Sequence, residues 1–216
     1  MKNKVLILLI FLISVFLIDK INANSFPLIG KVIIIDAGHG KQDPGTSAAG
    51  ILEKDINLAI SLFLEQELSR KGAIVLMTRT GDYDLSSPNA FWRKKSDFDN
   101  RIRLINNSNV DLYVSIHLNY LVQTKYSGPQ VFYNNKNEKN KEIATIIQNI
   151  LNEELKKNRQ IKKIPNDTYM YRKLIPPGIL IECGFLSNYS ERNKLKTSEY
   201  QRKLAKLIAL GIERAL

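Results

Sequence analysis

The stretch Val32-Ile-Ile-Ile-Asp-Ala-Gly-His39-Gly indicates the fold class of this chain. Its run of β-branched residues predicts a buried strand, because a strand that is apolar on both faces fits a sheet covered on two sides. A second run, Leu112-Tyr-Val-Ser-Ile-His117, has the same form and also closes on a histidine. The chain of 216 residues contains only these two histidines. Together they are candidate metal ligands, although each alone could be a hydrogen-bonded residue at a strand end.

Helical and strand patterns alternate along the rest of the chain. Apolar residues recur at helical spacing over 54–71, 98–105, 141–157 and 200–212. The predicted strands cover 31–36, 73–78, 111–116, 131–133 and 179–182. This alternation predicts a single α/β domain whose mostly parallel, twisted sheet has helices on both faces. The carboxyl ends of parallel strands form one edge of a sheet, so we expect His39, His117 and Glu182 to meet there.

The first 24 residues form a separate unit. Lys2 and Lys4 precede an apolar run from Val5 to Ile18, and Ala23 offers a small residue for cleavage, which is the layout of a secretory signal. At 1.5 Å per residue the run reaches about 21 Å, short of the roughly 30 Å of a bilayer core, so a cleaved signal is favoured over a membrane anchor. We expect a linker over 25–30 and one domain over 31–216.

The chain is basic, with a net charge of +11 at pH 7. Without residues 1–24 it keeps 29 basic and 20 acidic side chains. For an exported domain this charge suggests polyanionic surroundings such as a cell wall, whereas nucleic acid would be the partner of an intracellular protein. We therefore expect no nucleic acid partner, and membrane contact only through the N-terminal segment if that segment is not cleaved.

Two glutamates stand at informative places. Glu53 follows the glycine-bearing loop 45–50 and begins a predicted helix, where it could simply be a first-turn acid that favours the helix dipole. Glu182 follows the apolar strand 179–181. An unpaired charge at such a place costs several kcal/mol, so something must compensate it.

Several motifs then resemble a known family. In order they are Ile35-Asp-Ala-Gly-His39-Gly, Asp43-Pro-Gly45, Glu53, Ser115-Ile-His117-Leu-Asn119 and Ile181-Glu182-Cys-Gly-Phe-Leu-Ser-Asn188. They resemble the motifs of the zinc-dependent N-acetylmuramoyl-L-alanine amidases of bacterial cell-wall metabolism, and the resemblance spans Lys31 to Leu216.

The resemblance implies a catalytic domain with one zinc ion held by His39, Glu53 and His117. It also implies that Glu182 takes a proton from the attacking water and later gives it to the departing amine. The substrate would be peptidoglycan, and the bond cut would be the amide that joins the lactyl group of N-acetylmuramic acid to L-alanine.

Four further residues are expected to support the site or to contact substrate. Asp36, and either Ser115 or Asn119, are near enough in sequence to orient an imidazole, with turn and strand-end hydrogen bonding as the alternative. Arg101 could bind a stem-peptide carboxylate through its planar fork, or be an exposed helical arginine. Loop packing, rather than a glycan groove, is expected for Phe91, Trp92 and Tyr126.

Two rival functions can be weighed from the sequence. Cys183 could serve a cysteine amidase with a histidine as its base, but neighbours on a strand face opposite sides, so a Glu182 turned toward the site turns Cys183 away. A non-catalytic wall-binding domain on the same fold would be expected to lack a ligand or the proton-transfer group, and all four groups are present here.

The layout of a bare catalytic domain behind an export signal resembles the germination-specific amidases of spore-forming bacteria. Those enzymes act with a deacetylase to prepare muramic-δ-lactam in the spore cortex. This role implies export across the cytoplasmic membrane, to the cell wall or the space between forespore and mother cell. General autolytic or cell-division amidases are the alternative, and no residue indicates an accessory protein or a homo-oligomer.

Overall fold

The computed structural model describes residues 26–216. The predicted export segment 1–24 lies outside the described residues, as does the first residue of the predicted linker. Within the described part of the chain, no helix combines the length and apolar character that a membrane span needs.

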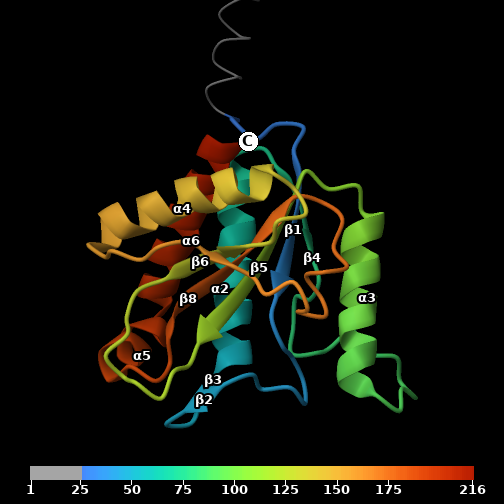
Figure 1. The fold of residues 1–216 in the computed structure, drawn as a ribbon, viewed down its shortest axis with the longest axis horizontal. Coiled ribbons are helices and arrows are strands. Elements are labelled where there is room, and N and C mark those ends of the chain that lie inside the picture. The colour runs from blue at the N-terminus through green and yellow to red at the C-terminus, as the bar shows by residue number, and fades with distance from the viewer. Residues whose placement is uncertain (1–25) are drawn as a thin grey trace, which may run out of the picture.

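A six-stranded sheet forms the centre of the molecule (Figure 1). Its strands, in spatial order, are β4 (Ile74–Met77), β1 (Val32–Ala37), β5 (Leu112–Asn119), β8 (Gly178–Phe185), β6 (Gln130–Tyr133) and β7 (Lys162–Lys163). Strands β4, β1, β5 and β8 run parallel, whereas β6 is antiparallel to β8 and β7 runs parallel to β6. The mostly parallel α/β fold expected from the sequence is confirmed.

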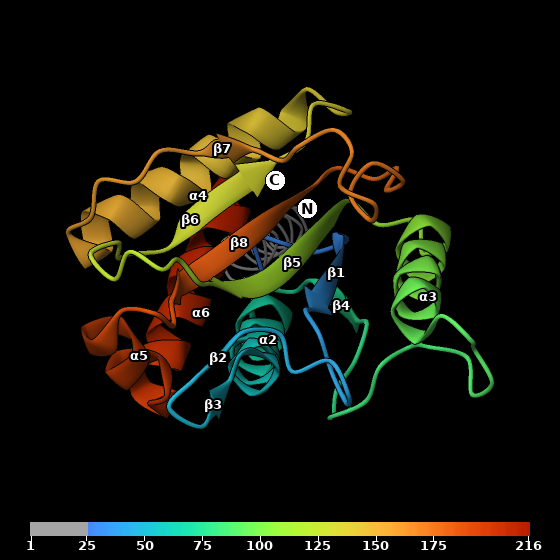
Figure 2. The same cartoon turned by 60° about the horizontal axis from the view of Figure 1, so that its bottom comes forward.

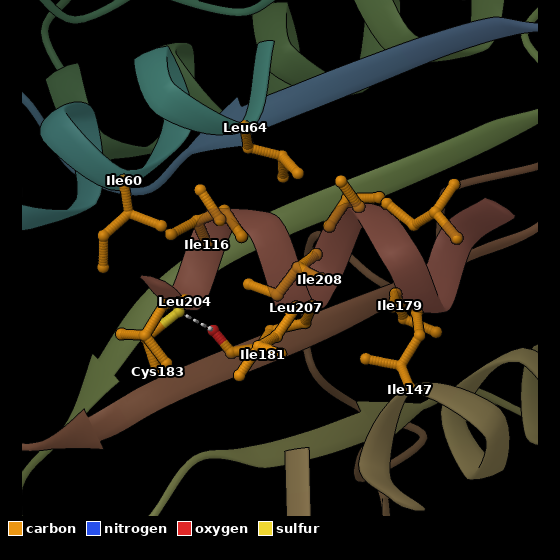
Figure 3. Packing of buried hydrophobic residues seen from close by; sticks show 14 of the residues in the cluster. Ile60, Leu64, Ile116, Ile147, Ile179, Ile181, Cys183, Leu204, Leu207 and Ile208 are labelled. Carbon is orange, nitrogen blue, oxygen red and sulfur yellow. Dashed lines mark hydrogen bonds between the residues drawn. The ribbon is translucent and has the colours of Figure 1, made fainter. Parts of the chain in front are cut away.

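Three helices cover one face of the sheet: α2 (Glu53–Arg70), α4 (Lys139–Leu155) and α6 (Ser198–Ala215). Helix α6 packs against both α2 and α4, and all three bury apolar side chains against the strands. Figure 3 shows this layer, where Ile60 and Leu64 of α2 and Leu204 and Ile208 of α6 surround Ile116 and Ile181 of the strands. The core therefore extends across the full width of the sheet and holds its strands in fixed positions.

The opposite face is covered more sparsely. Helix α3 (Arg93–Asn107) lies to one side of the sheet, separate from the other helices (Figure 2). A second apolar cluster joins it to the sheet and to the segment before β8; its buried members are Ile34, Ile102, Ile105, Val110, Tyr113, Ile164, Met170, Tyr171 and Leu174. Polar side chains of the strands also emerge on this face, which leaves room for a site at its edge.

The observed elements differ from the predicted ones mainly at their ends. Strand β5 continues two residues past His117 and β8 three residues past Glu182, so both side chains lie inside strands instead of closing them. Helix α3 begins at Arg93, five residues before the helical pattern found over 98–105. The short helix α5 (Tyr189–Leu195) and the hairpin of β2 (Ser47–Ala48) and β3 (Ile51–Leu52) were not predicted, because segments this short carry no clear periodicity.

Candidate metal centre and active site

The site lies at the carboxyl ends of β1, β5 and β8. In the parallel pair β5 and β8, His117 is opposite Glu182 in register. Residues paired in this way project from the same face of neighbouring strands, whose backbones are about 4.8 Å apart. The sheet alone therefore places an imidazole beside a carboxylate, although 64 residues separate the two in the chain.

His39, Glu53 and His117 converge on one point. Their candidate ligand atoms all lie within 4.8 Å of one another. Oε1 of Glu53 is 3.1 Å from Nε2 of His39 and 3.1 Å from Nδ1 of His117. The three side chains come from the loop after β1, from the first residue of α2 and from β5, so this arrangement depends on the tertiary fold.

Two glycines of the motifs allow this close approach. A Cβ atom at Gly38 would fall inside the van der Waals envelope of the His117 ring. At Gly45, which has a φ of +68°, a Cβ would collide with the side chains of both Glu53 and His39. The loop between β1 and α2 can therefore bring His39 close to His117 and Glu53 only with glycine at these positions.

Hydrogen bonds fix Glu53 and shift the pKa values of the group. The amide N–H groups of Thr46 and Leu118 donate to the Glu53 carboxylate at 2.8 and 3.1 Å. Burial alone would raise the pKa of Glu53, but the two neighbouring imidazoles hold it well below its usual range. Burial alone would likewise lower the pKa of His39, but hydrogen bonds with Asp43 and Glu53 raise it to about 9. In the metal-free protein these groups form a tight cluster joined by polar contacts of about 3 Å.

Asp43 is a site residue that the sequence analysis did not single out. Its Oδ2 lies 3.0 Å from Nδ1 of His39, so the carboxylate holds the imidazole with Nε2 turned toward Glu53. Asp36 had been expected to be a candidate for this orienting role. The sequence feature that could have indicated Asp43 is its place four residues after His39, within the Asp43-Pro-Gly45 motif.

Glu182 sits beside the cluster without a hydrogen-bonding partner for one of its oxygens. Its Oε2 is buried and makes no hydrogen bond. Burial raises the pKa of Glu182 to about 7, and the charge of Glu53 contributes in the same direction. A carboxyl group with such a pKa can gain or lose a proton near neutral pH.

Asp36, Ser115 and Arg101 form a buried network beneath the histidines. Arg101 donates to Asp36 at 2.6 Å and to Asp97 at 2.9 Å, and Ser115 donates to Asp36 at 2.8 Å. A further N–H of Arg101 donates to the backbone carbonyl of His39 at 2.7 Å. The network therefore holds the turn that carries His39.

These contacts correct several expectations. Arg101 is only 1% exposed and is occupied by internal acceptors, so it is not an exposed helical arginine and has no free fork for a substrate carboxylate. Asp36 meets Arg101, Thr78 and Ser115, and no hydrogen bond joins it to either imidazole. The contacts of these two side chains could not be predicted from the sequence, because their burial on this face of the sheet depends on how α3 packs.

The remaining candidates lie outside the converging group of side chains. Asn119 ends β5 just beyond His117, where its backbone carbonyl accepts a hydrogen bond from Leu186. Cys183 is fully buried on the opposite face, in the apolar core (Figure 3). Phe91 and Trp92 are 88% and 71% exposed and pack on each other edge to face, with ring centroids 5.1 Å apart, whereas Tyr126 stacks on Phe185.

A family model described as N-acetylmuramoyl-L-alanine amidase matches residues 33–214. This range contains the whole sheet apart from its first residue, as well as the converging side chains. The chain belongs to this family.

Individual amidases agree with the family match. The chain is 40% identical over 193 residues to the germination-specific N-acetylmuramoyl-L-alanine amidase of Bacillus subtilis (strain 168), covering 88% of this chain and 81% of that relative. The structure of the CwlD amidase from Clostridioides difficile, solved in complex with the GerS lipoprotein, has a TM-score of 0.81 and 40% identity over 86% of this chain and 98% of that one. An N-acetylmuramoyl-L-alanine amidase from Clostridium difficile 630 gives a TM-score of 0.73 and 34% identity, covering 84% of this chain and 94% of that one. The fold and the amidase class expected from the sequence are both confirmed.

Proposed function

We propose that this amidase is a zinc enzyme that hydrolyses the amide between N-acetylmuramic acid and L-alanine in peptidoglycan. His39, Glu53 and His117 are the proposed ligands, and Glu182 is the proposed proton-transfer group. One observation carries the proposal: three side chains of metal-binding type converge within 4.8 Å beside a carboxyl group whose buried Oε2 has no hydrogen-bond partner.

The donor set fits zinc. Two imidazoles and one carboxylate are an established set of ligands for catalytic zinc, and they leave a fourth position open. A bound zinc ion would supply a Lewis acid that polarises the amide carbonyl and lowers the pKa of a water molecule. Asp43 supports this set because its contact with Nδ1 of His39 leaves Nε2 as the ligand atom.

Glu182 is the group that remains to move protons. As a carboxylate it accepts a proton from the water that attacks the amide carbon. As a carboxylic acid it then donates that proton to the amine nitrogen when the carbon–nitrogen bond breaks. Burial raises its pKa to about 7 in the metal-free protein, and its position beside His117 brings it to the reacting atoms.

The proposed biological role is in the spore cortex. It is supported by the 40% identity to the germination-specific amidase of Bacillus subtilis. On this proposal the enzyme is exported through its N-terminal segment, removes stem peptides before muramic-δ-lactam forms, and acts with an accessory protein, as the CwlD amidase complex with GerS suggests. Spores that lack the protein should contain no muramic-δ-lactam, and normal lactam would instead favour a general autolytic or division amidase.

The activity can be tested on purified peptidoglycan. Zinc-loaded protein should release stem peptides with a new N-terminal alanine, detected by mass spectrometry. His39→Ala, Glu53→Ala and His117→Ala should each lower the zinc content measured by atomic emission, and a variant with an unchanged zinc content would remove that residue from the ligand set. Absence of peptide release from the zinc-loaded protein, with and without cell extract to supply a partner, would overturn the proposed reaction.

A further inference from the structure

Arg159 lies near the site but has no role in the proposed reaction. It belongs to the loop between α4 and β7, and its Nη2 donates a hydrogen bond to Oε1 of Gln130 at 2.6 Å. Gln130 is opposite Glu182 in the register of β6 and β8. Paired residues project from the same face of a sheet, so the guanidinium is anchored to a side chain of the strand next to that of Glu182, and the backbones of these two strands are about 4.8 Å apart.

The position of Arg159 is fixed from several directions. Its Cζ is 5.1 Å from the ring centroid of Phe185 and 5.8 Å from that of Tyr126, and these two rings stack on each other. Asn152 of α4 holds the backbone of Arg159 by accepting from its N–H at 3.0 Å and donating to its carbonyl at 2.8 Å. A guanidinium held in this way loses little conformational freedom when it binds a ligand.

The charge of Arg159 is not balanced within residues 26–216. Its ring contacts and its bond to Gln130 are neutral, and no carboxylate of this region forms an ion pair with it. Arg101, in contrast, pairs with both Asp36 and Asp97. Nη1 of Arg159 makes no hydrogen bond in the described chain. It is also not buried, so it is open to a ligand. A fixed arginine with an open donor is suited to bind a carboxylate.

We infer that Arg159 binds the first free carboxylate of the stem peptide and so determines which stem peptides the enzyme prefers. This inference rests on the proposed amidase function. The residue after L-alanine in peptidoglycan is a γ-linked glutamate, whose α-carboxyl group is either free or amidated. Two extended residues span about 7 Å, which is enough to cross from the strand of Glu182 to the neighbouring strand, about 4.8 Å away, where Gln130 anchors the guanidinium.

The test compares two substrates that differ only at this carboxyl group. They are N-acetylmuramoyl-L-alanyl-D-glutamate and its α-amide, N-acetylmuramoyl-L-alanyl-D-isoglutamine. The wild-type enzyme should have a kcat/KM about ten- to a hundredfold higher for the free acid, as expected for one charge-assisted hydrogen bond. Arg159→Gln should bring this ratio close to one, mainly through the KM of the acid, and Arg159→Lys should retain part of the preference.

Arg103→Gln is the matched control, because it removes one positive charge from an exposed position on α3. It should keep the wild-type ratio. An Arg159→Gln enzyme with an unchanged ratio, or with equal losses on both substrates, would overturn the inference, since equal losses indicate a structural role.

Binding provides a measurement that does not require turnover. Titration calorimetry of the two compounds against zinc-loaded Glu182→Gln, with and without Arg159→Gln, should show the same preference for the acid and its loss. If the wild-type protein hydrolysed neither compound nor peptidoglycan, the proposed reaction would fail, while the ratio of the two dissociation constants would still decide the role of Arg159.

Discussion

At the scale of single residues, Glu182 is the most informative side chain. It lies beside His117 in the register of β5 and β8, and its buried Oε2 has no hydrogen-bond partner. Burying an oxygen without a hydrogen-bond partner costs free energy of folding. The strand therefore carries a group that weakens the fold and serves the proposed reaction.

Glu182→Gln should lower kcat by about 10²- to 10⁴-fold, because the amide keeps the shape of the carboxyl group but cannot accept and return the proton. Zinc content should remain at the wild-type level. Peptide release and atomic emission measure the two effects. Cys183→Ala is the control on the same strand, and its activity should persist because the thiol points into the apolar core. A fully active Glu182→Gln enzyme would rule out the proposed role.

The raised pKa of Glu182 also predicts a pH-dependent stability. Burial raises this pKa from 4.5 to about 7, so the folded protein holds the proton more strongly than the unfolded chain does. The free energy of unfolding therefore falls as the pH rises from about 4.5 to 7, by roughly 3 kcal/mol for this group. Urea unfolding of the metal-free protein should show this loss, and Glu182→Gln should remove it. Parallel pH profiles for the two proteins would contradict the prediction.

At the scale of elements, Arg101 connects α3 to the loop that carries His39. Its guanidinium pairs with Asp36 of β1 and Asp97 of α3 and binds the carbonyls of Ala37 and His39. Helix α3 stands apart from the three helices on the other face, so this polar contact supplements the small apolar cluster beneath it (Figure 2).

Arg101→Met should lower the free energy of unfolding by about 3 to 5 kcal/mol, because two buried carboxylates lose their cation. It should also weaken zinc binding, since the His39 turn loses a hydrogen bond. Urea unfolding and competition with a zinc indicator measure the two effects. Arg103→Gln on the same helix should change the free energy of unfolding by less than about 0.5 kcal/mol. A small, equal effect of both substitutions would show that the network contributes little.

At the scale of the whole molecule, the proposed zinc site joins the start of α2 to β5 and to the loop after β1. A ligand that binds only the folded state stabilises it by mass action, by about 4 kcal/mol at a thousandfold excess over Kd. For a domain of this size, removing zinc with a chelator should lower Tm by roughly 10 °C. Scanning calorimetry with and without chelator measures this shift. Glu53→Gln should show little response, and an equal response would point to a different metal site.

The amino-acid sequence determined the fold class and predicted the four side chains on which the proposed site depends. Apolar runs separated by helical patterns are local features, so they predicted the parallel sheet, and the strand ends predicted that His39, His117 and Glu182 would share one edge. The family motifs added Glu53 to this set.

Only the tertiary structure decided which side chains support that set. Asp43, and not Asp36, contacts His39, and Arg101 is buried in an ionic network. Arg159, Gln130 and Phe185 meet although separate segments supply them. These contacts follow from strand register, from the path of loops and from the packing of α3 and α4. They depend on the position of each side chain in the assembled molecule, which no local pattern of residues encodes.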